Sequence, residues 1–337
     1  MINHIIIAFI VMLEFVAGRD ILKIPIQKDS FTGKEIIYDI YTPNLPKSDS
    51  KKLIILIHGM TIAGKDDEDL VFLAKRLAKL GFEVFVPEIR GLKNCQIGYE
   101  ETNEIKVAID TAIHLYPDHK TGVMSFCYGN GVLLPVFDDE KIAKNIDFLI
   151  IWGGYASMKD LLRFNLLGYY PVDGKLIYSE PDIEVKNKYI NQKYWYNFLP
   201  QQSRKEWLNA LKTNKTGNLT GAQKNTYQFL KNTKLNKFEE YYNKLSPEIQ
   251  NWLKIISPEN YIVKVNCKII FVHSLRDTLV PYQDALKLYG FANKQNNKPF
   301  ILPIFEHANL ELVKIGIADV IRGFFIFYMF ILTLVFI

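Results

Sequence analysis

Short apolar runs alternate with segments of helical periodicity along most of the 337-residue chain. The apolar runs are rich in β-branched and aromatic residues and contain few polar positions. This pattern is typical of strands that are covered on both faces of a parallel sheet. The predicted buried strands are 52–59, 82–88, 121–126, 146–154, 268–274 and 299–305, and the alternating run at 34–42 predicts one more strand.

Helical patterns lie between these runs. Residues 69–81 have apolar positions at helical spacing and end at Gly81, a residue that is common just after helices. Residues 101–117 also fit a helix, as does the segment ADVIRG near the end of the chain. Alternation of strands and helices predicts an α/β fold, namely a doubly wound and mostly parallel sheet.

Residues 158–256 interrupt this rhythm. They contain no convincing buried strand and are rich in Tyr, Trp, Asn and Lys, and the helix predicted at 203–212 begins at a Ser that is expected to cap it. The stretch predicts a helical insertion that covers a site on the sheet.

The N-terminal residues also depart from the alternation of strands and helices. Residues 5–13 are continuously apolar and lead to Glu14 and a patch of small residues, which is typical of a signal peptide or a membrane segment. The residues before this run include no Lys or Arg, so a surface-docked N-terminal helix or a mispredicted start is the alternative.

The C-terminal residues 323–337 are uncharged and almost wholly apolar. They are shorter than the roughly 20 residues of a spanning helix, and extension backwards meets Arg322 and Asp319. We expect a membrane-dipping tail or anchor. The two ends together favour a secreted, periplasmic or membrane-associated protein, with a cytoplasmic location as the alternative.

Composition limits the classes of function. Hydrophobic residues make up 49% of the chain and charged residues 23%, which is typical of a folded globular protein. The three widely spaced cysteines argue against a disulfide framework and a cysteine-ligated metal site. The net charge of +5 comes from the insertion, but its basic residues are scattered singly, so we expect a solvated outer face and no nucleic-acid partner.

Four motifs carry candidate chemistry, and each follows a predicted strand. They are ILIHGM at 55–60, the turn Ser125-x-Cys127-x-Gly129, the segment with Asp277 at 271–281, and the segment with His307 at 304–311. Ligands bind at the carboxyl ends of strands in open parallel sheets. The chain order nucleophile, acid, histidine is that of hydrolases with a nucleophile on a strand–turn–helix elbow.

Such an elbow holds its nucleophile in a strained backbone, so the residues two positions away must be small. Ser125 and Gly129 satisfy this requirement for Cys127. If Ser125 were the nucleophile, Val123 and Cys127 would occupy those places, and Val fits poorly; Ser125 stays as an alternative nucleophile.

With these motifs the sequence resembles the α/β-hydrolase superfamily over roughly residues 20–323. The cysteine in SFCYGNG is similar to that of the dienelactone hydrolase branch, whose members use a Cys-Asp-His triad, although those enzymes lack such a long insertion. The resemblance implies that Cys127 attacks, that His307 transfers protons and that Asp277 orients His307. It also implies that the main-chain N–H groups of Met60 and Tyr128 form an oxyanion hole.

The other candidates are given structural roles. Cys95 and Cys267 are expected to be packing residues, and His58 and His273 to be structural histidines at strand ends. Glu306 is adjacent to His307 on a strand end and should point to the opposite face, so it is not expected to be the acid.

We divide the chain accordingly into five parts. They are residues 1–18, the signal peptide or membrane segment; 19–157 and 257–322, the two parts of the α/β-hydrolase core; 158–256, the helical cap; and 323–337, the apolar tail.

The function expected from the sequence is hydrolysis of a carboxylic ester, lactone or thioester through a covalent acyl-enzyme. No cofactor or metal is implied, and the partner is a small ester or acyl substrate, with membrane contact through the apolar ends. Two alternatives stay open: an acyltransferase that uses the same site, and a catalytically silent binding or scaffold protein. The oligomeric state is not predicted.

Overall fold

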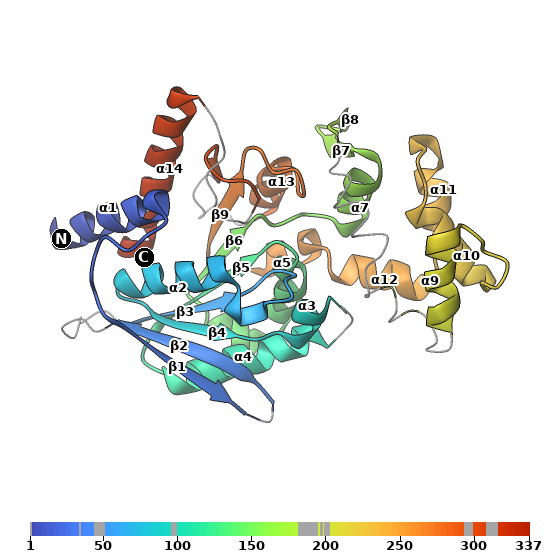
Figure 1. Ribbon diagram of the computed structural model, residues 1–337. Coiled ribbons are helices and arrows are strands. Elements are labelled where there is room, and N and C mark those ends of the chain that lie inside the picture. The colour runs from blue at the N-terminus through green and yellow to red at the C-terminus, as the bar shows by residue number, and fades with distance from the viewer. Residues whose placement is uncertain are drawn as a thin grey trace.

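The computed structural model (Figure 1) describes residues 2–33, 35–43, 51–95, 100–180, 203–292, 299–307 and 316–337, together with Trp195 and Phe198. Its described residues form an eight-stranded sheet in the order β1-β2-β4-β3-β5-β6-β9-β10. The pairs β1–β2 and β2–β4 are antiparallel, and all other neighbours are parallel. The strands are β1 (Ile26–Thr32), β2 (Ile37–Pro43), β3 (Lys52–Ile57), β4 (Glu83–Pro87), β5 (Lys120–Phe126), β6 (Phe148–Trp152), β9 (Lys268–Ser274) and β10 (Phe300–Leu302). The mostly parallel, doubly wound sheet expected from the sequence is confirmed.

Two hydrophobic cores, one on each face, sandwich the sheet. Alternate residues of β3 point to opposite faces: Leu53, Ile55 and Ile57 join one core, while Ile54 and Leu56 join the other. Because both faces are covered, the central strands are apolar at nearly every position, which is the pattern that predicted them.

The helices divide between these faces. Helices α1 (Ile2–Ala17), α2 (Glu68–Lys79) and α14 (Ile317–Phe336) supply the core on one face. The other face is covered by α3 (Arg90–Asn94), α4 (Glu101–Leu115), α5 (Gly129–Leu133), α6 (Glu140–Lys144) and α13 (Gln283–Phe291). Helix α2 ends where the sequence predicted, because Gly81 follows its last turn in a left-handed conformation with φ of 94°.

An insertion leaves the sheet after β6 and returns at β9. Its described elements are α7 (Met158–Leu167), a hairpin of β7 (Tyr169–Val172) and β8 (Lys175–Tyr178), α9 (Arg204–Thr213), α10 (Gly221–Leu230), α11 (Phe238–Asn243) and α12 (Pro247–Ile255). Aromatic side chains hold it together, with Trp207 packing edge-on against Tyr227. Figure 1 shows α9, α10 and α11 at the far end of the molecule from α1 and α14. Residues 181–194 of the predicted cap lie outside the described residues.

Two details of the insertion differ from the expectation. The hairpin was not predicted, although its loop is Asp173-Gly174 and both residues have positive φ, which is the strongest short hairpin signal. Ser203 does precede α9, but its side chain makes no capping hydrogen bond.

The N-terminal segment packs onto the sheet layers as α1. Ala8, Val11 and Phe15 are buried, and Phe15 packs edge-on against Phe327 of α14 with ring centroids 5.0 Å apart. The carboxylate of Glu14 is also buried, and its Oε1 lies 2.9 Å from Nζ of Lys79. The charge that is unusual in an apolar leader therefore has an ionic partner inside the folded protein.

Candidate active site

Cys127 occupies the sharp turn between β5 and α5. Its φ of +48° lies in the left-handed region, which costs energy for a residue other than glycine. Its main-chain N–H donates to the carbonyl of Trp152 over 3.0 Å, and its carbonyl accepts a hydrogen bond from the side chain of Asn130 over 3.0 Å. These two hydrogen bonds hold the turn in place.

The small residues around this turn are required by close contacts. A Cβ on Gly129 would lie 2.7 Å from the carbonyl oxygen of His58 and 2.9 Å from Oγ of Ser125. A Cβ on Gly131 would lie 1.9 Å from the hydroxyl oxygen of Tyr155. Both glycines therefore allow the helix to begin directly behind the nucleophile position.

Exposure separates the two candidate nucleophiles. Ser125 is completely buried, and its hydroxyl has no hydrogen-bond partner among the described residues. Cys127 is half-buried and so remains accessible. The geometry of the turn thus favours Cys127 over Ser125 as the residue that meets a substrate.

The two other predicted residues meet beside the turn. Asp277 follows β9 and His307 follows β10, two neighbouring parallel strands. Nδ1 of His307 lies 2.7 Å from Oδ2 of Asp277. Glu306 contacts Thr278 instead, over 3.5 Å, so Asp277 rather than Glu306 is the partner of the imidazole.

A main-chain loop fixes the orientation of Asp277. Its Oδ1 accepts hydrogen bonds from the N–H groups of Leu279 and Val280 over 2.9 and 2.8 Å. Because its other oxygen faces His307, the fully buried carboxylate has partners on both oxygens.

His273 is a further contact of this carboxylate, one that the sequence analysis did not foresee. Its Nε2 lies 3.2 Å from Oδ2 of Asp277 and 3.0 Å from the carbonyl oxygen of Val280. Two acceptors around one nitrogen favour the tautomer with the proton on Nε2. His273 is buried at the end of a strand, as expected, but it also holds the acid; its spacing of four residues before Asp277 was the available signal.

Asp277 and His307 shift each other's pKa in opposite directions. Burial alone would raise the pKa of Asp277, but His307 and His273 outweigh it, and the pKa falls below the usual range. Burial alone would lower the pKa of His307, but the carboxylate of Asp277 and the sulfur of Cys127 raise it well above its ordinary value. The pair therefore favours a protonated imidazole beside a carboxylate.

The second ring nitrogen of His307, Nε2, is the one that is left for Cys127. Nε2 is buried and has no hydrogen bond of ordinary geometry to a described residue. The sulfur of Cys127 nevertheless lies close enough to raise the pKa of the ring.

The loop after β3 lies against the same turn. A Cβ on Gly59 would be 3.4 Å from Cβ of Cys127, so this loop packs directly against the cysteine. His58 connects this loop to the segment after β4. Its Nδ1 contacts the Gly59 carbonyl oxygen over 2.7 Å, and its Nε2 accepts a hydrogen bond from the N–H of Ile89 over 3.1 Å. Burial lowers the pKa of His58, in keeping with a neutral structural histidine. Met60 directly follows Gly59, and Tyr128 directly follows Cys127.

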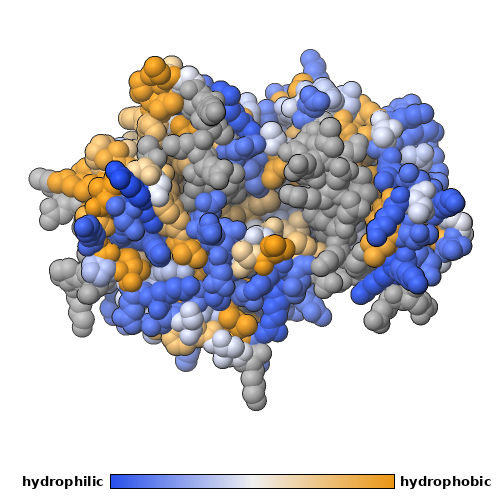
Figure 2. Space-filling model, in the orientation of Figure 1, coloured by the Kyte–Doolittle hydropathy of each residue, from blue (hydrophilic) through white to orange (hydrophobic). Residues whose placement is uncertain are grey.

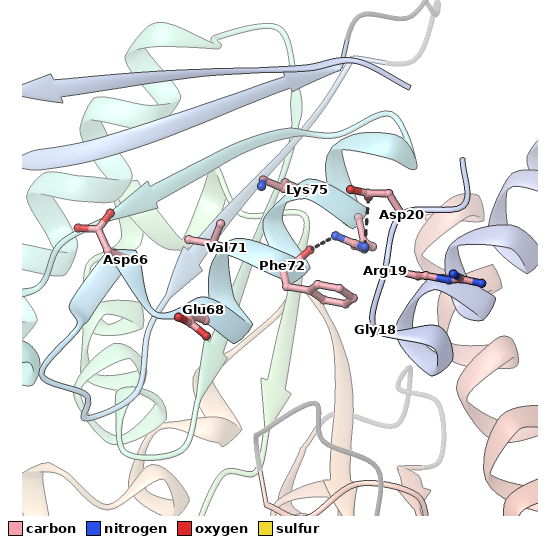
Figure 3. Close-up of a pocket in the computed structure, with 9 residues that line it drawn as sticks. Gly18, Arg19, Asp20, Asp66, Glu68, Val71, Phe72 and Lys75 are labelled. Atoms are coloured by element: carbon pink, nitrogen blue, oxygen red, sulfur yellow. Dashed lines mark hydrogen bonds and ion pairs between the residues drawn. The ribbon is translucent and has the colours of Figure 1, made fainter. Parts of the chain in front are cut away.

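Other candidate chemistry lies elsewhere. Burial raises the pKa of the Cys267 thiol to about 12, so this cysteine is suited to packing. No group of three or more His, Cys, Asp or Glu side chains in the described part of the chain is placed to hold a metal ion. A cavity of about 320 Å³ beside α2 is lined by Gly18, Asp20 and Phe72 and does not reach Cys127 (Figure 3).

Comparisons with known proteins agree on the fold. No protein-family model matches the sequence, and no curated protein matches it. The solved structure of Est1E from Butyrivibrio proteoclasticus superposes with a TM-score of 0.50 and 13% identity, over 91% of this chain and 98% of that one. An esterase from Pyrococcus furiosus has a TM-score of 0.44 and 15% identity, over 82% and 80% of the two chains.

At these identities the likeness concerns the fold. The chain has the α/β-hydrolase fold, as its motifs predicted.

Proposed function

We propose that the protein is a carboxylic ester hydrolase that acts through Cys127, His307 and Asp277. The observation that carries the proposal is the accessible cysteine at a positive-φ turn, beside an imidazole that a buried carboxylate orients over 2.7 Å. A nucleophile, a base and an orienting acid in this relation form a catalytic triad whatever the sequence order.

The first half of the reaction forms a thioester. The Cys127 thiolate attacks the substrate carbonyl carbon, and the carbonyl oxygen becomes an oxyanion that the N–H groups of Met60 and Tyr128 can stabilise, each by roughly 3 kcal/mol. Collapse of the tetrahedral intermediate breaks the ester C–O bond. His307 donates its proton to the leaving alkoxide, so the alcohol departs and the acyl group stays on sulfur.

The second half releases the acid. Neutral His307 takes a proton from a water molecule, whose oxygen attacks the thioester carbonyl. The C–S bond breaks, the carboxylic acid leaves, and the thiolate and protonated imidazole are restored. Asp277 stabilises the imidazolium in both halves.

The substrate class follows from the reaction steps. Lactones and thioesters have the same reactive carbonyl as esters and fit the same sequence of steps.

A pair of variants of the full chain tests the proposal. We expect Cys127→Ala to abolish hydrolysis of p-nitrophenyl acyl esters, while Ser125→Ala retains it, because only the cysteine is accessible. Activity that survives Cys127→Ala and disappears in Ser125→Ala would overturn the choice of nucleophile. Product analysis with an added alcohol separates hydrolysis from acyl transfer, since a transferase would form the new ester.

A further inference from the structure

Helices α1 and α14 carry one continuous exposed apolar surface. On α14, Ile317, Ile321, Phe325 and Met329 follow one another at intervals of four residues, so they form a stripe along one face. On α1, Ile6 and Phe9 are exposed. We call these six residues the apolar platform; Figure 2 shows hydrophobic residues gathered over this end of the molecule.

The two parts of the platform touch. The ring of Phe9 packs edge-on against Tyr328, the neighbour of Met329, with centroids 5.9 Å apart. Below this contact, Phe15 and Phe327 meet in the buried core. The helices therefore form one rigid unit that is buried on one side and exposed on the other.

Ionic contacts attach this unit to the rest of the protein. Glu14 of α1 binds Lys79 and Arg76 of α2 over 2.9 and 3.3 Å. Lys52, at the start of β3, donates to the carbonyl of Val335 over 2.6 Å, and Lys120, at the start of β5, donates to the carbonyl of Ile337. Lysine side chains at a helix C-terminus are stabilised by its partial negative charge.

These contacts bear on how α14 meets a lipid bilayer. Its length and composition would allow it to cross a membrane. However, Phe327, Phe330 and Leu334 are buried against the sheet, and its final carbonyls are bound by lysines. A helix held in this way can present its outer face to lipid but cannot leave the sheet without exposing its inner face.

We infer that the apolar platform docks the protein onto the surface of a membrane, with Ile321 and Phe325 entering the acyl-chain boundary. Ile321 and Phe325 lie within α14, where main-chain N–H and C=O groups pair along the helix, so these positions bring no unpaired main-chain group into lipid. Exposed Arg19, two residues after the end of α1, and exposed Arg322, on α14, supply the positive charge that complements anionic headgroups. Interfacial helices combine an apolar face with such basic residues.

Docking would also place the candidate active site near the lipid surface. Arg276, the residue before Asp277, contacts Asp319 in the first turn of α14 over 3.3 Å. The loop of the triad acid and the start of the platform are therefore neighbours, which suits an ester substrate that resides in the membrane. This orientation rests on the proposed function, whereas docking itself does not.

Vesicle flotation of the full chain tests the docking. Vesicles of phosphatidylcholine with phosphatidylglycerol should carry the protein upward in a density gradient, more strongly than phosphatidylcholine alone. The double variant Ile321→Glu/Phe325→Glu should bind roughly tenfold or more weakly, since two apolar side chains no longer enter lipid. The matched control is Val263→Glu, which changes a side chain of similar exposure, 59% against 65% and 66%, away from the platform.

Several results would overturn the inference. They are absence of binding by the parent chain, equal binding by the double variant, or equal loss in the control. A parent chain that is dimeric without vesicles, ignores lipid, and becomes monomeric in the double variant would make the platform a contact between copies instead. Binding is measured without substrate, so failure of the ester hydrolase proposal would leave this result unchanged.

Discussion

The carboxylate of Asp277 serves two imidazoles at once. His307 lies 2.7 Å from Oδ2 and His273 lies 3.2 Å from the same oxygen. Both contacts lower the pKa of Asp277, so it stays ionised throughout the pH range in which His307 titrates. The acid is thereby kept as a fixed negative charge.

Asp277→Asn should reduce kcat roughly 10³- to 10⁴-fold, because the amide can neither select the tautomer of His307 nor stabilise its charge. Loss of the carboxylate also lowers the pKa of His307, since Asp277 is the main group that raises it. The alkaline limb of the pH–rate profile should therefore move to lower pH. Glu306→Gln is the control, and it should leave both kcat and the profile close to those of the parent; an equal effect would contradict the assignment of the acid.

The residues that meet at this site were largely predictable from sequence. Small residues around Cys127, and polar residues directly after apolar strands, indicated which side chains would converge. The contact of His273 with Asp277 was not foreseen, because it depends on how the loop at 275–279 folds back over the strand end. Strand patterns contain no information about that loop.

At the scale of the element, α1 depends on the charges that it buries. Glu14 receives hydrogen bonds from the N–H groups of Ile21 and Leu22 over 2.8 and 2.6 Å, in addition to its contacts with Lys79 and Arg76. The two buried cations, Lys79 and Arg76, are thus paired with two carboxylates: that of Glu14 and that of Asp20, which contacts both.

We expect Glu14→Gln to lower the free energy of unfolding by about 3 kcal/mol, because it removes the buried carboxylate and leaves two buried cations with only the exposed carboxylate of Asp20. Urea denaturation of the full chain measures this value. Glu140→Gln, which breaks an exposed pair with Lys144 3.3 Å away, should change it by less than about 0.5 kcal/mol. A loss for Glu14→Gln as small as that of the control would show that α1 is not held by this pair.

Sequence patterns predicted some elements better than others. The central strands were found because burial on both faces makes them apolar throughout, as in β6, where every residue is buried. The edge strand β1 was missed because most of its residues are exposed and polar. The expected apolar tail at 323–337 proved to be the greater part of α14, which begins at Ile317 and includes Asp319 in its first turn and exposed Arg322 in its second.

At the scale of the whole molecule, one buried acid should couple folding to pH. Asp284 of α13 is buried, and this raises its pKa to about 7, although the N–H of Ala156 and the charges of His273 and Lys287 oppose the shift. The folded protein therefore keeps a proton that the unfolded chain releases above about pH 4. Stability from this group is present at low pH and is lost as the pH rises toward 7.

The contribution of Asp284 to the free energy of unfolding should fall by about 1.4 kcal/mol per pH unit between about pH 4 and 7. Asp284→Asn should remove this slope and be the more stable protein at pH 7. Urea midpoints of both chains at several pH values measure the difference. Parallel curves for the two proteins would show that the carboxyl does not titrate between those limits.

The central claim is that Cys127 carries the acyl group during turnover. The most direct measurement is the intact mass of the full chain, quenched in acid during hydrolysis of an activated ester, followed by peptide mapping of the adduct. The account predicts a mass increase equal to the acyl group, located on the peptide that contains Cys127 and absent from Cys127→Ala. An adduct on another residue, or turnover by Cys127→Ala at the parental rate, would contradict it.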